Sequence, residues 1–212
     1  MKKIKVIGLL GRSGTGKNTV ADHLRIMSGG QIHVPLLTTS RPKRPGEIEG
    51  VEYHFVTKEK ALKQIEEHAD EIVWHSCFND WYYYLPVGHL SGDKLNLCVL
   101  NPAAAVTMAG HADEWNLEIR LFELTLPDYD LWLRVASRPD LDEVARRWPE
   151  DKKDFSEPHY TKLPVCRLEN KNSEVTSHML YNYIRGMEDA WTKSFRPSIW
   201  NPRIYECPTI KE

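Results

Sequence analysis

The sequence lacks a strong excess of either charge, with 28 Lys and Arg against 30 Asp and Glu in 212 residues. A near-balanced charge gives no general attraction to nucleic acid or to an anionic membrane. The chain also lacks an apolar run long enough to cross a membrane, and its apolar start, residues 4–10, leads into a glycine-rich loop rather than a cleavage site. We therefore expect a cytoplasmic protein with no membrane partner.

Cysteine is sparse and lacks the spacing of a redox or metal motif. Cys77, Cys98, Cys166 and Cys207 are far apart and form no C-x-x-C pair, which favours a reduced, intracellular protein. The nine histidines show no H-x-x-x-H pattern, so a structural metal site is not expected. Internal repeats and low-complexity segments are absent too, and the 41% hydrophobic content suffices for one buried core.

Short apolar segments alternate with amphipathic ones along the chain. We expect strands over residues 4–10, 32–37, 71–75, 95–100, 117–126 and 165–168, and helices over 19–27, 58–68, 128–137, 141–155 and 174–190. This alternation predicts an α/β fold, a three-layer sandwich of the P-loop NTPase type with a mostly parallel central sheet. The aromatic residues of 191–212 predict an irregular extension packed on a domain of residues 1–190.

A glycine-rich loop lies between the first predicted strand and helix. Residues 11–18 read Gly-Arg-Ser-Gly-Thr-Gly-Lys-Asn, which follows the G-x-x-x-x-G-K-[ST] phosphate-loop pattern in the context that it requires. Glycines let backbone N–H groups converge on phosphate oxygens at a helix N-terminus, and the lysine neutralises the β- and γ-phosphates of ATP. The residues predicted to bind ATP are Gly11, Ser13, Gly14, Thr15, Gly16, Lys17, Asn18 and Thr19.

Asn18 stands where this motif has a Ser or Thr hydroxyl for magnesium. An amide oxygen also binds a hard cation, so we expect Asn18 to support Mg²⁺ through its carbonyl or a bridging water. Thr19, the next residue, leaves a second hydroxyl nearby.

Residues 38–55, Thr-Thr-Ser-Arg-Pro-Lys-Arg-Pro-Gly-Glu-Ile-Glu-Gly-Val-Glu-Tyr-His-Phe, resemble the T-T-R-x-P-R-x-G-E-x-x-G-x-D-Y-x-F pattern of the guanylate kinase family. The resemblance implies a nucleoside monophosphate (NMP) as acceptor, with its phosphate held by Arg41, Arg44 and Tyr53. It also implies a further phosphate-binding tyrosine, Tyr82 with Tyr83 as the alternative, in an NMP-binding arm over residues 37–88. Guanidinium groups bind an acceptor phosphate bidentately, which agrees with this assignment.

The positions that read guanine in that family are changed in this sequence. Leu37 stands at the first family Ser, Val73 at the family Glu, and Tyr84 near the second Ser, while Asn101 follows the strand whose end is acidic in the family. We assign these four residues to NMP binding, with a less polar base such as a thymine-like or modified pyrimidine as one reading and (d)GMP as the other. The alternative is that they belong to the core.

Charged residues 134–150 resemble the lid of the same family. Arg134 and Arg138 lie four residues apart, and Arg147, with Arg146 as a substitute, follows in the next predicted helix. Positive groups that close over the reacting phosphates stabilise charge and exclude water, so we expect Lys17, Arg134, Arg138 and Arg147 to act in catalysis. A salt-bridged surface is the alternative reading of these arginines.

The sequence thus predicts an ATP- and magnesium-dependent NMP kinase. Two other readings use the same phosphate loop: a kinase acting on a modified base in DNA or on a sugar phosphate, and a non-catalytic guanylate kinase-like binding module. The retained Gly16 and Lys17 argue against the last.

Overall fold

The computed structural model describes residues 2–78, 80–136 and 141–191, with the backbone alone at residues 78, 141–147 and 187–191. Its centre is a parallel sheet with the strand order β2-β7-β1-β8-β9. The strands are β1 (Ile4–Gly11), β2 (Ile32–His33), β7 (Leu95–Val99), β8 (Leu117–Thr125) and β9 (Val165–Glu169). Because β1 is in the middle, the loop that follows it opens at the centre of the sheet's carboxyl edge, where open α/β sheets bind ligands.

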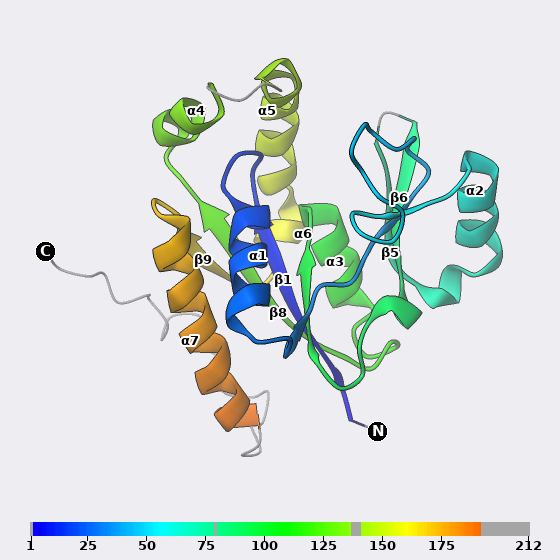
Figure 1. The fold of residues 1–212 in the computed structure, drawn as a ribbon, viewed down its shortest axis with the longest axis horizontal. Helices are drawn as coiled ribbons and strands as arrows, with labels where there is room; N and C mark the ends of the chain where they lie inside the picture. The colour runs from blue at the N-terminus through cyan, green and yellow to red at the C-terminus, as the bar shows by residue number, and fades with distance from the viewer. Residues whose placement is uncertain (1, 79, 137–140, 192–212) are drawn as a thin grey trace, which may run out of the picture.

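Helices cover both faces of this sheet, which is therefore the middle of three layers (Figure 1). On one face lie α1 (Lys17–Met27) and α7 (Ser173–Trp191), and on the other α3 (Pro102–Gly110) and α6 (Pro158–Thr161). Each face of the sheet has its own apolar cluster. Ile7 and Leu9 of β1 pack on the face covered by α1 and α7, while Val6 and Leu10 pack on the face covered by α3 and α6, and all four are fully buried. Burial on both faces explains the continuous apolar run of β1. The predicted three-layer α/β fold is confirmed.

A second, smaller sheet with the strand order β4-β3-β6-β5 lies beside the core, at the right in Figure 1. Its strands are β3 (Thr38–Thr39), β4 (His54–Phe55), β5 (Ile72–Phe78) and β6 (Trp81–Pro86), and we call it the arm sheet. Helix α2 (Lys58–Glu67) packs on it around a separate cluster of Ala61, Ile72 and Tyr84. The short 3₁₀ helices Ala69–Glu71 and Val87–His89 flank the β5–β6 pair.

Helices α4 (Asp128–Ala136) and α5 (Leu141–Phe155) stand beyond the carboxyl edge of the central sheet, at the top of Figure 1. Residues 137–140 between them and residues 192–212 lie outside the described part of the chain, as does the predicted packing of 191–212 beyond Trp191. The division into an NMP-binding arm and a lid stays a prediction. Within the described helices, none has the length and apolar character needed to span a membrane.

Helix α3 is absent from the sequence-based expectations. Its residues are apolar on nearly every side, and Pro102, Ala104, Ala105 and Met108 are buried, so the helical spacing of apolar residues is hidden. The local start signal is nevertheless present. Asn101 is the N-cap, with its Oδ1 accepting a hydrogen bond of 2.8 Å from Ala104 N, and Pro102 is the first helical residue.

Candidate functional site

The phosphate loop joins the end of β1 to the start of α1 through glycines in left-handed or extended-positive conformations. The φ angles of Gly11, Gly14 and Gly16 are 147°, 86° and 89°, where side chains are strained. Space is also limited, because a Cβ on Gly14 would lie 2.2 Å from Val135 Cγ1 and one on Gly16 would lie 2.7 Å from Asn170 Nδ2. The loop therefore depends on glycine both for conformation and for packing.

Lys17 and Thr15 hold the loop from within. Lys17 Nζ donates to the carbonyl oxygens of Gly11 at 2.5 Å and Arg12 at 3.1 Å. Thr15 is buried, and its Oγ1 donates to Arg12 O at 2.8 Å. Asn18 and Thr19 are exposed on the first turn of α1. The positions predicted from the motif are thus gathered at one helix N-terminus.

Asn170 is a site residue that the sequence reasoning missed. It lies just after β9, has no exposed surface, and donates from Nδ2 to Thr15 O at 2.6 Å. Arg134 Nη2 in turn donates to the carbonyl oxygens of Asn170 and Lys171, at 2.9 and 3.0 Å. Arg134 of α4 is therefore fixed beside the phosphate loop. The available signal was a polar residue directly after a predicted strand of the sheet.

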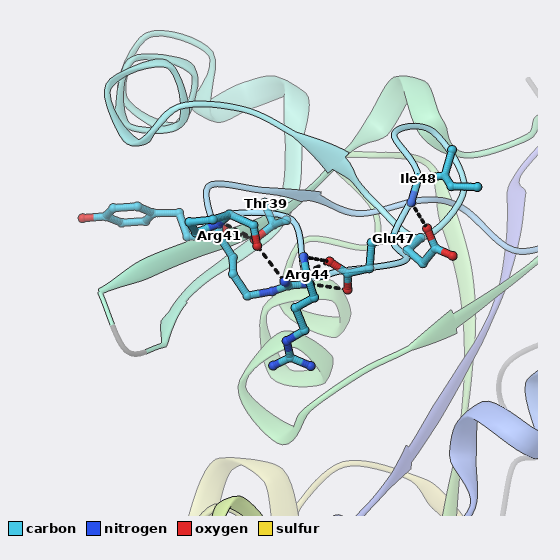
Figure 2. Close-up of polar contacts among 8 residues, drawn as sticks. Thr39, Arg41, Arg44, Glu47 and Ile48 are labelled. Atoms are coloured by element: carbon cyan, nitrogen blue, oxygen red, sulfur yellow. Dashed lines mark hydrogen bonds and ion pairs between the residues drawn. The ribbon is translucent and has the colours of Figure 1, made fainter. Parts of the chain in front are cut away.

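The acceptor-side loop is organised around an arginine–carboxylate pair (Figure 2). Arg41 Nη2 and Nη1 donate to Glu47 Oε1 and Oε2 at 2.7 and 3.0 Å, and Arg44 N donates to Glu47 Oε2 at 2.7 Å. The Arg44 guanidinium is exposed and points away from Glu47 in Figure 2. Hydrogen bonds from Arg41, and then from Arg44 N, lower the pKa of Glu47 to about 2, while the bond to Glu47 raises the pKa of Arg41.

Aromatic rings line the same guanidinium. Arg41 Cζ lies 5.5 Å from the ring centroid of Tyr53 and 5.7 Å from that of Phe55, within cation–π range. The rings of Tyr53 and Tyr83 meet edge to face at 6.1 Å. Burial, and then the neighbouring Tyr83, raise the pKa of Tyr53, so its hydroxyl stays a neutral donor near pH 7. Arg41, Tyr53 and Tyr83 form what we call the acceptor cluster.

Tyr82 and Tyr84 pack on the α2 side of the arm sheet, and their assignment to NMP binding stays a prediction. In the β5–β6 pair Ser76 is opposite Tyr83 and Trp74 opposite Leu85, so Tyr83 shares a face with Leu85 rather than with its neighbours. Tyr84 is 1% exposed, packs under α2 and donates its hydroxyl hydrogen bond to Gln64. Tyr82 packs against the same cluster. A one-residue offset exchanges the two faces of a strand, and position counting in the sequence does not resolve it.

Three other residues assigned to the base also have structural roles here. Val73 has no exposed surface and lies in the apolar cluster beside α3, and Leu37 packs against that cluster. Asn101 caps α3 with its side chain. Trp74, next to Val73, is 4% exposed, and its Nε1 has no hydrogen-bond acceptor among the described residues. Among the described residues of the arm sheet, this indole N–H is the buried side-chain polar group that has no hydrogen-bond partner.

Of the predicted lid arginines, the structure describes the side chain of Arg134 alone. Arg138 lies outside the described residues, and the side chains of Arg146 and Arg147 are outside the description as well. Their catalytic roles stay predictions. Two described residues of α5 do reach the phosphate loop: Trp148 covers Arg12, and Asp151 accepts a hydrogen bond from Ser13 N.

Comparisons with known proteins find sequence similarity in the first part of the chain. The guanylate kinase family model matches residues 3–85. Guanylate kinase from Zymomonas mobilis is 39% identical over 70 residues, which are 33% of this chain and 32% of that protein. Guanylate kinase from Frankia casuarinae is 41% identical over 78 residues, 37% of this chain and 41% of that protein. The chain thus matches about a third to two fifths of the length of these curated relatives.

The fold extends the likeness beyond the matched sequence. The crystal structure of guanylate kinase from Anaplasma phagocytophilum superposes with a TM-score of 0.58 over 88% of this chain and 87% of that one, at 21% identity. At this identity the likeness shows a shared fold. The phosphate loop and the acceptor loop both lie inside residues 3–85, the part of the chain that is similar in sequence to the guanylate kinase family.

Proposed function

We propose that this protein transfers the terminal phosphoryl group of ATP to a nucleoside monophosphate, with GMP as the simplest acceptor. The observation that supports the proposal is that one chain carries two arrangements suited to bind phosphate. The phosphate loop presents backbone N–H groups and Lys17, and the acceptor cluster presents Arg41. An ATP hydrolase or an ATP-binding module needs only the first. The relatives named guanylate kinase support GMP as the acceptor.

Phosphoryl transfer between two phosphates requires positioning and charge stabilisation more than proton transfer. The attacking group is already an anionic phosphate oxygen, so no general base is required. Lys17 would bind the β- and γ-phosphates, while Arg41 and Arg44 would orient the acceptor phosphate. Arg134, held beside the loop by Asn170 and Lys171, would stabilise charge in the transition state with Arg138 and Arg147.

Magnesium would reach the site with ATP. The described residues contain no group of three or more His, Cys, Asp or Glu side chains able to hold a metal ion. Asn18 is exposed on the first turn of α1, and its amide oxygen is a suitable ligand for a hard cation beside the phosphates. When bound, the ion would neutralise phosphate charge.

The base side of the site would be backed by apolar core residues and one buried donor. Leu37 and Val73 bring no hydrogen-bonding group where the family has Ser and Glu. Trp74 lies two residues from Ser76, which is opposite Tyr83 of the acceptor cluster, so it shares the strand face of Tyr83. Its unpaired Nε1–H is buried here and would donate to a carbonyl oxygen of the base once binding opens the arm sheet around it. A purine or pyrimidine carbonyl accepts such a bond, so this donor selects for a base that carries one.

The proposal is tested by offering MgATP with GMP, dGMP, dTMP, dCMP and dAMP and measuring diphosphate formation. We expect turnover of at least one acceptor, led by GMP, and a loss of at least about 10²-fold in Lys17→Met. Lys63→Met, an exposed lysine of α2, is the matched control. Absence of turnover with the whole panel would refute the proposal, and a preference for dTMP would replace GMP as the acceptor.

A further inference from the structure

Helices α4 and α5 cover the second and third residues of the phosphate loop. Ser13 N donates to Asp151 Oδ2 of α5 at 2.5 Å. Arg12 forms an ion pair with Asp128, the first residue of α4, and its Cζ lies 4.3 Å from the ring centroid of Trp148 in α5. Asp128 is further paired with Lys152 at 3.0 Å. Asp128 of α4 and Asp151 of α5 thus hold these helices against the loop through an ion pair and a hydrogen bond.

The peptide group that contains Ser13 N lies beside Lys17 Nζ. Lys17, whose ammonium binds the β- and γ-phosphates in such loops, places Nζ 3.1 Å from Arg12 O. That carbonyl belongs to the same peptide group as Ser13 N. The C=O and N–H of this trans peptide point to opposite sides, so the expectation that Ser13 N–H meets a phosphate rests on the carboxylate it already binds, since Asp151 Oδ2 has the charge and acceptor character of a phosphate oxygen.

Arg12 has unused hydrogen-bonding capacity at the same place. Its side chain is 16% exposed, and while Nη1 pairs with Asp128, Nε and Nη2 are buried without an acceptor among the described residues. A buried donor without a partner costs free energy, and more so when charged. The Nε and Nη2 edge of a guanidinium is a bidentate donor for a tetrahedral anion. The unpaired Nε and Nη2 donors of Arg12 therefore have the geometry to bind a phosphate group.

We propose that Arg12 is a ligand of the terminal phosphate of ATP, and that Asp151 holds the place of that phosphate while the nucleotide is absent. This inference rests on the ATP-binding half of the proposed function. The incoming phosphate and the Asp151 carboxylate carry like charges and compete for Ser13 N–H, so binding displaces α5 from the loop. Arg12 then uses its Nε and Nη2 edge for the phosphate.

The test compares binding of ADP and of a non-hydrolysable ATP analogue by calorimetry, with no acceptor present. Arg12→Met keeps much of the side-chain volume and removes the charge, and Arg25→Met, an exposed arginine of α1, is its matched control. We expect Arg12→Met to weaken the analogue about tenfold or more and ADP less than about twofold. Arg25→Met should leave both affinities unchanged.

Asp151→Asn supplies the opposite change, since it keeps the shape but removes the charge that competes with phosphate. We expect the ATP analogue to bind about threefold tighter or better, with ADP little affected. Asp154→Asn, one turn of helix or less away and exposed, is the control.

Equal effects of Arg12→Met on both nucleotides, or no effect, would overturn the inference and leave Arg12 as an anchor for α4. The kinase proposal is judged separately. Turnover of monophosphates by the wild type with an unchanged ATP-to-ADP affinity ratio in Arg12→Met would refute this inference alone. Selective loss of the ATP analogue in a protein that turns over no monophosphate would refute the kinase proposal alone.

Discussion

Arg41 and Glu47 form a bidentate pair, with Nη2–Oε1 and Nη1–Oε2 distances of 2.7 and 3.0 Å and side chains only 11% and 17% exposed. The same carboxylate accepts a hydrogen bond from Arg44 N. One acidic side chain therefore fixes the guanidinium of Arg41 and the backbone that carries Arg44. Glu47 sets the geometry of the cations that we propose for the acceptor phosphate.

Removing this carboxylate should weaken acceptor binding more than turnover. In Glu47→Gln the bidentate bond is lost and Arg41 gains rotamer freedom, so the KM for the preferred monophosphate should rise about tenfold with a smaller change in kcat. Steady-state kinetics with saturating MgATP provide the measurement. Glu52→Gln, whose carboxylate accepts from Ile48 N in the same loop, is the control, and an unchanged KM in Glu47→Gln would contradict the prediction.

Glu47 should also make folding pH-dependent in the acid range. Its pKa in the folded state is about 2, below the ordinary value of 4.5 that applies to the unfolded chain. A depressed pKa means that the stabilisation is complete above about pH 4.5 and is lost as the pH falls toward 2. Denaturant titrations over this window should show the unfolding free energy falling more steeply in the wild type than in Glu47→Gln. Parallel curves would be inconsistent with the pair.

Asn170→Ala should loosen the phosphate loop. Removing the buried amide leaves Thr15 O without its 2.6 Å donor, which should cost about 1–3 kcal/mol of unfolding free energy and weaken ATP binding. Asn172→Ala is the matched control, since it removes the cap that accepts from Glu174 N and Val175 N at the start of α7. It should cost about 1 kcal/mol and leave ATP affinity unchanged. Equal ATP affinities for the two variants would count against the role of Asn170.

Trp74→Phe separates base recognition from packing. The change retains an aromatic ring and removes the Nε1–H that has no acceptor among the described residues, so the ligand-free protein should be as stable as the wild type or more stable. The rise in Tm produced by the preferred monophosphate should shrink if the base carbonyl accepts from Nε1. Thermal unfolding with and without monophosphate checks both statements. An undiminished ligand-induced rise would exclude Trp74 as the donor.

The motifs in the sequence predict the phosphate loop and the acceptor loop because each is a local signal. Gly16 and Lys17 are adjacent to a strand and a helix whose apolar spacing is clear, and Arg41 to Glu47 lie within seven residues of one another. Their contacts depend on backbone conformation over short distances. The three-layer fold follows equally from alternating strands and helices.

The sequence does not reveal contacts between residues far apart in the chain, nor which face of a strand each side chain takes. Asn170 reaches Thr15 across 155 positions, and Asp151 reaches Ser13 across 138, so no local pattern joins them. The choice between Tyr82 and Tyr83 depends on which face of β6 each side chain takes, and this is set by the pairing of β6 with β3 and β5. An offset of one residue exchanges the two faces without changing the composition.

The separate cluster of Ala61, Ile72 and Tyr84 bears on how the molecule opens. Because this cluster has so few buried apolar residues, we expect α2 and the short strands β3 and β4 to open together at low local free energy. Their amide protons should exchange with solvent through sub-global opening, well before those of β1 and β8, whose register is continuous from Ile4–Leu117 to Gly11–Leu124. We therefore expect the acceptor loop to be attached to a part of the fold that opens at low free energy, and the phosphate loop to extend from a part that opens later.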